Sequence, residues 1–286
     1  MSSVRVEAFD NFVLDQDGVL YHGTQPIDGS LETVARLQQA GKRVFFATNN
    51  STRSRAEVAA RLSAHGISAP PEAVLTSAAA AANHLDAMLP AKQRRVLVVG
   101  EAGLVTELQA VGCVADTCPV GEVSLRDAAF AALFAPNAMR YDAVVVGYDG
   151  AFTTAKLARA SAAVQRGAKL VGTNPDAGDA CGDGIFPGAG ALIAAVEAAT
   201  GVRAFVVGKP APQMLTQLLQ RHSLDPGRTL MVGDRLDTDI AFGTAGGVHT
   251  CLVLTGVATA EQAAALPPGD ARKPTHVLKS LSELQF

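Results

Sequence analysis

Short apolar runs alternate with longer segments of helical period along the 286-residue chain. The runs are rich in β-branched residues and bounded by glycine or polar residues, as expected for strands buried on both faces of a sheet. They cover residues 12–14, 44–46, 96–99, 144–146, 205–207, 230–232 and 252–254. The helical segments cover residues 30–40, 55–65, 155–166, 189–199 and 212–222. This alternation predicts an α/β fold with parallel sheets, because each helix is long enough to form a crossover connection.

Four of the apolar runs are followed directly by polar residues that could carry chemistry. These residues are Asp15 and Asp17 after the first run, Thr48, Asn49 and Asn50 after the second, Lys209 after residues 205–207, and Asp234 after residues 230–232, with Asp239 five residues further on. Ligands of open parallel sheets bind at the carboxyl ends of the strands. We therefore expect these four groups to meet at one edge of one sheet.

The middle of the chain has a different character. Its apolar runs, between residues 96 and 170, are not followed by a comparable cluster of charged residues. We infer that this part is a second α/β unit inserted into the first. The predicted domains are a core of residues 1–90 plus 200–286 and an inserted cap of residues 91–199.

The composition narrows the class of protein. Apolar residues make up 48% of the chain, which is enough for a sizeable core, and the formal net charge of −3 gives no reason to expect nucleic acid or an anionic membrane as partner. No apolar run reaches the roughly 20 residues that span a bilayer, and the N-terminus lacks the pattern of a signal peptide. The four cysteines contain no C-x-x-C pair, which is typical of reduced thiols. We expect a cytoplasmic protein.

The residue types at the four strand ends suit phosphoryl transfer. A carboxylate such as Asp15 can attack phosphorus when it is ionised and held in line with the scissile bond. A second carboxylic acid, Asp17, can protonate the leaving oxygen and later deprotonate water. Gly18 allows the backbone to turn closely around a phosphate. Each motif alone occurs in ordinary turns and helix caps, so it is their joint placement that predicts a site.

The repulsion between a carboxylate nucleophile and a phosphate must be offset by positive charge. Asp15 and Asp234 supply oxygen ligands that suit Mg²⁺ rather than zinc. Lys209 adds a fixed charge that keeps Asp15 ionised and binds phosphoryl oxygens. Thr48 offers a hydroxyl donor, while Asn49 and Asn50 offer backbone N–H groups near a helix start. Asp239, one turn beyond Asp234, could steady Lys209 or a metal-bound water.

These strings resemble the motifs of the haloacid dehalogenase superfamily of phosphohydrolases. Residues 13–20 (Val-Leu-Asp-Gln-Asp-Gly-Val-Leu) look like its first motif, residues 48–51 like the second, residues 207–210 like the third and residues 231–240 like the fourth. The segments 173–176 and 187–190 resemble the subgroup with a large α/β cap of the C2 type, which comprises the NagD, 4-nitrophenyl phosphatase, pyridoxal phosphate phosphatase and phosphoglycolate phosphatase proteins. The resemblance implies a Rossmann-like core with the cap inserted between the second and third motifs.

The resemblance also implies roles. Asp15 would be the nucleophile and Asp17 the acid and base, so that an aspartyl-phosphate forms on Asp15 and is then hydrolysed. Mg²⁺ would be held by the Asp15 carboxylate, the Asp17 carbonyl and Asp234. Phosphate would be bound by Thr48, Asn49, Asn50 and Lys209, with Asp239 behind the metal ligands. Capped relatives often form homodimers through the cap, and we expect the same here.

The substrate depends on the cap. The segment 174–187 resembles the family's specificity loop, which carries a histidine in pyridoxal phosphate phosphatases and an arginine in mammalian phosphoglycolate phosphatases. Here it holds Asp179, Cys181 and Asp183 and no basic residue. Either acid could disfavour an anionic leaving group, or simply form a turn. We predict activity on small phosphorylated metabolites, such as 4-nitrophenyl phosphate, with the physiological ester open. The alternatives are a phosphoprotein phosphatase and a catalytically idle sensor of phosphorylated ligands.

Overall fold

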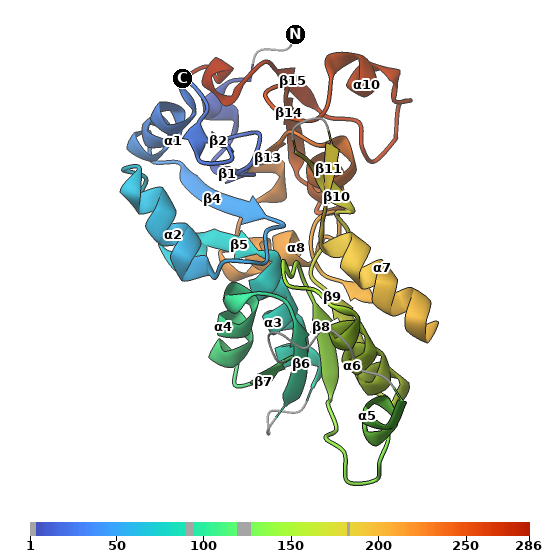
Figure 1. The fold of residues 1–286 in the computed structure, drawn as a ribbon. Helices are drawn as coiled ribbons and strands as arrows, with labels where there is room; N and C mark the ends of the chain where they lie inside the picture. The colour runs from blue at the N-terminus through green and yellow to red at the C-terminus, as the bar shows by residue number, and fades with distance from the viewer. Residues whose placement is uncertain (1–3, 90–93, 119–126, 182–183) are drawn as a thin grey trace. The chain divides into compact units, whose positions relative to one another are not determined.

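The computed structural model describes residues 4–89, 94–118, 127–181 and 184–286, and the chain forms two compact units (Figure 1). Unit 1 comprises Met1–Thr48, Ala56–Leu75 and Lys209–Phe286, and unit 2 comprises Asn49–Arg55 and Thr76–Gly208. The chain passes briefly through unit 2 at residues 49–55, returns to unit 1, builds the rest of unit 2 at residues 76–208 and returns again, as expected for an inserted domain.

Unit 1 is built on a six-stranded sheet with the strand order β15-β14-β13-β1-β4-β5. The strands are β1 (Asn11–Leu14), β4 (Arg43–Thr48), β5 (Val74–Thr76), β13 (Thr229–Gly233), β14 (His249–Val253) and β15 (His276–Leu278). The central strand β1 pairs in parallel with both β4 and β13, so that Phe12 lies opposite Val44 and Leu230. All four residues of β1 are buried, because helices cover a parallel sheet on both faces. The first, second and fourth motifs therefore end on three adjacent strands.

The helices of unit 1 form between the strands, as the alternation predicts. They are α1 (Ser30–Gln39), α2 (Arg55–Ala64), α8 (Gln213–Arg221), α9 (Ala241–Ala245) and α10 (Ala260–Ala265), with 3-10 turns at Val6–Ala8, Pro71–Ala73, Pro226–Arg228 and Leu281–Glu283 and a π-helical turn at Leu236–Ile240. A small hairpin of β2 (Tyr21–His22) and β3 (Gln25–Pro26) follows the first motif. Apolar side chains such as Phe12, Phe46 and Leu62 are fully buried between the layers.

Unit 2 contains a second parallel sheet, with the order β12-β9-β8-β6-β7. Its strands are β6 (Arg95–Val99), β7 (Val114–Thr117), β8 (Ala143–Val146), β9 (Lys169–Gly172) and β12 (Phe205–Val206), and its helices are α3 (Ser77–Met88), α4 (Ala102–Ala110), α5 (Asp127–Ala132), α6 (Thr154–Gln165) and α7 (Ala189–Thr200). A two-stranded hairpin, β10 (Gly178–Cys181) with β11 (Gly184–Pro187), precedes α7.

The alternation of side chains along β6 explains why its apolar run is unbroken. Val96 and Val98 pack with residues of α3 and α4 on one face. Leu97 and Val99 pack with residues of α6 and α7 on the other face. Because successive residues of a strand point to opposite faces, a strand between two helical layers has to be apolar at every position.

The predicted α/β fold with two parallel sheets is confirmed, but one strand lies in the other sheet. We expected the run at residues 205–207 to join the sheet of Asp15, whereas β12 pairs with β9 in unit 2. Likewise, α3 lies in unit 2, although the predicted core extended to residue 90. A two-residue strand does not encode its partner, since both sheets are parallel and similarly apolar. Within the described residues, no helix has the length and apolarity needed to cross a membrane.

Candidate active site

The centre of the site in unit 1 is Asp15, the residue directly after β1. Its N–H donates to the carbonyl of Val232 at 2.9 Å, which continues the parallel ladder with β13 and fixes the backbone. Asp17 is exposed two residues further on. Between them and the hairpin, Gly18 adopts a φ of +79° and donates its N–H to the carbonyl of Tyr21 at 2.7 Å. A left-handed turn of this kind favours glycine.

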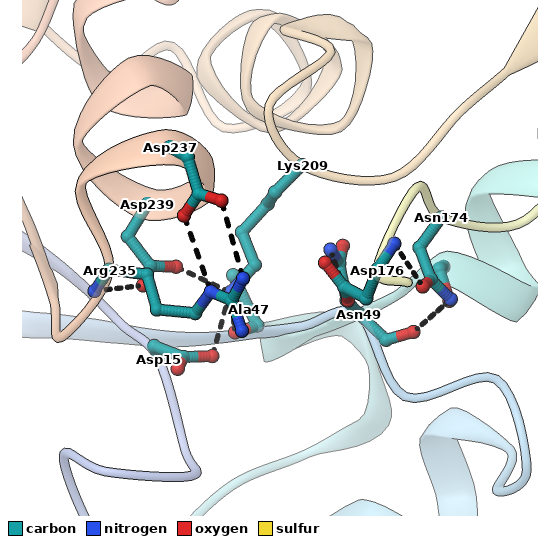
Figure 2. A network of polar contacts seen from close by, with 10 residues as sticks. Asp15, Ala47, Asn49, Asn174, Asp176, Lys209, Arg235, Asp237 and Asp239 are labelled. Atoms are coloured by element: carbon teal, nitrogen blue, oxygen red, sulfur yellow. Dashed lines mark hydrogen bonds and ion pairs between the residues drawn. The ribbon is translucent and has the colours of Figure 1, made fainter. Parts of the chain in front are cut away.

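Lys209 joins the first and fourth motifs. Its Nζ donates to Oδ1 of Asp15 at 2.7 Å, to Oδ1 of Asp239 at 2.7 Å and to the carbonyl of Ala47 at 3.2 Å (Figure 2). Only 3% of the Lys209 side chain is exposed, so these ion pairs lie in a medium that screens charge poorly.

Asp239 is itself held in place from the main chain. Its Oδ2 accepts the N–H of Arg235 at 3.1 Å, at the start of the π-helical turn. The Arg235 side chain forms a separate, more exposed ion pair with Asp237 at 3.3 Å (Figure 2). Asp239 therefore has one oxygen on the backbone and one on Lys209, which fixes the lysine beside Asp15.

Asp234 follows β13 and completes a buried group of three carboxylates. Asp15, Asp234 and Asp239 each offer an oxygen, and these oxygens lie within 4.8 Å of one another. Oδ2 of Asp234 accepts the N–H of Val257 at 2.9 Å. Oδ1 of Asp234 is buried and has no hydrogen-bond partner in the described part of the chain. A buried carboxylate oxygen without a donor is costly unless a cation binds it.

The pKa values reflect the excess of negative charge. Burial and the charges of Asp239 and Asp234 raise the pKa of Asp15 well above its usual range, although Lys209 opposes this. Burial, followed by the charge of Asp239, raises the pKa of Asp234 to about 6. Burial alone would lower the pKa of Lys209, but the two bonded carboxylates raise it. One ammonium therefore does not balance three carboxylates.

These observations fit a divalent cation with oxygen ligands. The three carboxylates are hard donors, the set contains no cysteine or histidine, and the oxygen Oδ1 of Asp234 lacks a donor. This donor set suits Mg²⁺. A cation would also remove the imbalance of charge that raises the pKa values of Asp15 and Asp234.

The second motif is divided between the two units. Thr48 is the last residue of β4 and is buried in unit 1. Asn49 and Asn50 belong to unit 2. This division was not expected from the sequence, where the three residues form one string.

Within unit 2, a network of polar contacts holds Asn49. Its Nδ2 donates to Oδ2 of Asp176 at 3.0 Å, and its carbonyl accepts Nδ2 of Asn174 at 2.9 Å (Figure 2). The same carbonyl also accepts the hydroxyl of Ser77 at 2.6 Å. Asn174 in turn accepts the N–H of Asp176 at 3.2 Å. The segment 173–176, which we associated with the cap, thus sets the position of Asn49.

One strand end that borders the site was missed from the sequence. Thr255 and Gly256 follow β14, the neighbour of β13, and the Thr255 hydroxyl donates to the carbonyl of Gly18 at 2.6 Å. The available signal was the pair Thr-Gly directly after the apolar run at 252–254. That pair is ordinary turn chemistry, so it did not stand out.

The acidic loop residues are described only in part. The backbone of Asp179 and Cys181 lies in β10, where Asp179 is opposite Phe186 and Cys181 is opposite Gly184. Their side chains, and all of Asp183, lie outside the described part of the structure. The two alternatives from the sequence, in which these aspartates disfavour an anionic leaving group or simply form a turn, therefore both stay open predictions.

Comparison with known proteins matches both halves of the chain to one family of hydrolases. The profile described as haloacid dehalogenase-like hydrolase matches residues 12–114, and a second one, HAD-hydrolase-like, matches residues 206–284. Chronophin from Bos taurus is 42% identical over 88% of this chain and 83% of its own length. The D-glycerol 3-phosphate phosphatase of Mycobacterium tuberculosis is 38% identical over 99% of this chain and 73% of its own length.

Solved structures of similar proteins share the fold. The glycerol phosphate phosphatase of Mycobacterium tuberculosis in complex with magnesium has a TM-score of 0.82 and 36% identity, over 100% of this chain and 78% of the other. The p-nitrophenyl phosphatase of Archaeoglobus fulgidus has a TM-score of 0.80 and 31% identity, over 96% and 97% of the two chains. Two parallel-sheet units, one inserted in the other and one carrying acidic strand ends, define a capped α/β hydrolase.

The chain belongs to the haloacid dehalogenase-like hydrolases, in the subgroup of NagD, 4-nitrophenyl phosphatase and chronophin, which carries an α/β cap. It is a phosphatase that acts on small phosphate esters. The predicted family and class of enzyme are confirmed.

Proposed function

We propose that the chain hydrolyses small phosphorylated metabolites through an aspartyl-phosphate formed on Asp15. The observation that carries this proposal is the 2.7 Å contact between Lys209 Nζ and Oδ1 of Asp15. It fixes a carboxylate at the end of β1 and supplies the positive charge that favours the ionised, nucleophilic form.

The reaction has two halves. In the first, a carboxylate oxygen of Asp15 bonds to phosphorus, the ester P–O bond breaks and Asp17 gives its proton to the leaving oxygen. In the second, water bonds to phosphorus, Asp17 takes up a proton from that water, and the bond between phosphorus and Asp15 breaks. Inorganic phosphate leaves and both aspartates return to their starting forms. The exposure of Asp17 suits exchange with water and with the leaving alcohol.

The phosphate is bound by Thr48 and Lys209 of unit 1 together with Asn49 and Asn50. Lys209 can contact the phosphoryl oxygens because Asp239 holds its Nζ at 2.7 Å, next to Asp15. Asp239 thus positions the lysine and does not touch the substrate.

Asp15, the carbonyl of Asp17 and Asp234 would hold Mg²⁺. When bound, Mg²⁺ lowers the repulsion between the Asp15 carboxylate and the phosphate. The oxygen Oδ1 of Asp234, which is buried and without a donor among the described residues, supports this assignment.

The cap segment bears on which phosphate ester is the physiological substrate. The relatives named above include a D-glycerol 3-phosphate phosphatase and a p-nitrophenyl phosphatase. Since segment 176–184 of this chain carries no basic residue, we expect esters with neutral leaving groups to be preferred over anionic ones such as phosphoglycolate.

A screen of phosphate release in the presence of Mg²⁺ tests the proposal. The panel contains 4-nitrophenyl phosphate, glycerol 3-phosphate, sugar phosphates, nucleotides, pyridoxal phosphate, phosphoglycolate and a phosphopeptide. We expect release from small esters, little from the phosphopeptide and none with Asp15→Asn. If Asp15→Asn releases phosphate as fast as the wild-type chain, the nucleophile is another group. If the wild-type chain prefers the phosphopeptide, the phosphoprotein alternative replaces the proposal.

A homodimer formed through unit 2 is part of the same proposal. It rests on the resemblance to capped relatives. Light scattering coupled to size-exclusion chromatography tests it, and a mass of one chain over a wide range of concentrations would contradict it.

A further inference from the structure

The loop that joins β14 to α10 contacts Asp234 of the proposed metal site and Gly18, the residue after Asp17. The Thr255 hydroxyl donates to the carbonyl of Gly18 at 2.6 Å. The N–H of Val257 donates to Oδ2 of Asp234 at 2.9 Å, and the N–H of Ala258 donates to the carbonyl of Asp234 at 3.0 Å. The loop therefore holds Asp234 by its main chain and by one oxygen of its carboxylate.

Two glycines make this close approach possible. A Cβ atom added at Gly256 would overlap the carboxylate of Asp234, and one added at Gly18 would overlap the same group. The backbone at residues 18 and 256 therefore packs directly on the carboxylate of Asp234. Rotation of this carboxylate is restricted, because the backbone of both glycines lies directly against it.

The contacts also decide which oxygen of Asp234 is available. Val257 occupies Oδ2, while Oδ1 is buried and has no partner among the residues that the structure describes. The loop thereby presents one oxygen toward a ligand and keeps the other on the backbone. Groups that orient a metal ligand in this way tune metal affinity without touching the metal.

We infer that Thr255, Gly256 and Val257 form a positioning loop for the divalent cation. Thr255 fixes the turn at Gly18, which follows the Asp17 carbonyl, and Gly256 and Val257 orient Asp234. This inference rests on the proposed Mg²⁺ site at Asp15, Asp17 and Asp234. It adds a fifth strand end to the four that the sequence singles out.

Titration calorimetry of Mg²⁺ binding to the full chain tests the inference without relying on activity. For Gly256→Ala we expect the Kd for Mg²⁺ to rise by about 10- to 100-fold, the range seen when groups behind metal ligands are altered. Thr255→Val should raise the Kd by about 10-fold, and Thr255→Ser, which retains the hydroxyl, should restore it. The melting temperature measured in chelator should change little in the two Thr255 variants.

Gly150 of unit 2 and Thr216 of α8 in unit 1 provide matched control substitutions. Gly150→Ala adds a Cβ that would meet its neighbours at ordinary contact distances of 3.4 Å or more. Thr216→Val removes a hydroxyl that donates to carbonyls one turn back in α8. Both should bind Mg²⁺ as the wild-type chain does.

Three outcomes are possible. A raised Kd in Gly256→Ala and Thr255→Val, with restoration by Thr255→Ser, supports the inference. An unchanged Kd in folded Thr255→Val and Gly256→Ala overturns the inference but not the proposed metal site. If Gly256→Ala does not fold, the result for Thr255→Val decides. A wild-type chain that binds no Mg²⁺ overturns the metal site itself, and the inference with it.

Discussion

Each unit contains a buried lysine bonded to an aspartate that follows a parallel strand, yet the two surroundings differ. In unit 2, Lys156 Nζ donates to both oxygens of Asp149 at 2.9 and 2.7 Å, and one of these oxygens also accepts the N–H of Ala151 at 2.9 Å. In unit 1, Lys209 is bonded to Asp15 and Asp239, with Asp234 in the same cluster.

The difference lies in the balance of charge. One ammonium matches one carboxylate in unit 2, whereas one ammonium faces three carboxylates in unit 1. A balanced and fully bonded pair serves the fold, because breaking it leaves a buried charge unpaired. An unbalanced group keeps an uncompensated charge that a cation and a phosphate can use. The location of an ion pair at a strand end therefore does not by itself mark a catalytic site.

The same substitution at the two lysines should separate these roles most strongly. Lys209→Met should lower kcat/KM for 4-nitrophenyl phosphate by about 100-fold or more, because a charge near the transferring phosphoryl group is lost. Lys156→Met should leave the rate per folded molecule within about 2-fold of wild type, because Lys156 stabilises no charge in the transition state. Both rates are measured at saturating Mg²⁺, with the folded fraction determined by circular dichroism. Equal losses of rate in the two variants would remove the distinction.

The paired aspartates should respond in opposite directions when stability is measured. Asp149→Asn leaves Lys156 buried without a counter-charge, so the free energy of unfolding should fall by about 3–5 kcal/mol. Asp15→Asn removes one of three crowded carboxylates, while Lys209 keeps Asp239. Since burial and its neighbours raise the pKa of Asp15, the ionised form destabilises the fold at neutral pH. Urea unfolding in chelator should therefore show Asp15→Asn at least as stable as wild type, and a large loss there would contradict the unbalanced charge.

Asp176 offers a smaller test of how unit 2 contributes to catalysis. Asp176→Ala removes the carboxylate that accepts Nδ2 of Asn49. If Asn49 binds phosphate, its altered position should lower kcat/KM by about 10-fold, mainly through KM. Asp142→Ala, in the same unit but bonded to the N–H of Arg95, serves as a control. A rate equal to wild type in Asp176→Ala would show that this contact does not position Asn49 for the reaction.

The smallest predicted effect is a pH dependence of stability that arises from His84 in unit 2. His84 stacks on Phe205 with ring centroids 4.2 Å apart, and burial lowers the pKa of His84. The stability that neutral His84 contributes is present above its unfolded pKa, about 6.5, and is lost as the pH falls through that value toward the folded pKa. Between about pH 7.5 and 5.5, wild type should lose more stability in urea than His84→Gln does. Parallel losses in both proteins would assign the pH dependence to other groups.

The pattern of apolar runs was sufficient for the fold class, because a strand between two helical layers has to be apolar on both sides. It placed β1, β4, β6, β8 and β13 within one or two residues of their observed bounds. It could not assign β12 to a sheet, since the partner of a two-residue strand depends on the packing of the whole unit. Lys209 nevertheless lies in unit 1, because it follows the return of the chain to that unit.

The site residues that could be predicted from the sequence are charged residues that follow apolar runs. Asp15, Asp234 and Lys209 carry charge just after apolar runs, Asp239 follows Asp234 by five residues, and all four lie together in unit 1. Thr255 and Gly256 could not be predicted, since their importance lies in contacts with Gly18 and Asp234 that are remote in the sequence. Asp149 and Lys156 were also missed as a pair, because two opposite charges seven residues apart are common on helix surfaces.

Trapping of the covalent intermediate tests the central claim most directly. The chain is mixed with excess 4-nitrophenyl phosphate and Mg²⁺, quenched in acid within the first turnovers and digested for mass spectrometry. The account predicts one added phosphoryl group on the peptide that contains Asp15, and conversion of Asp15 to homoserine by borohydride. Steady release of phosphate with no label on Asp15, or with the label on another residue, would contradict it.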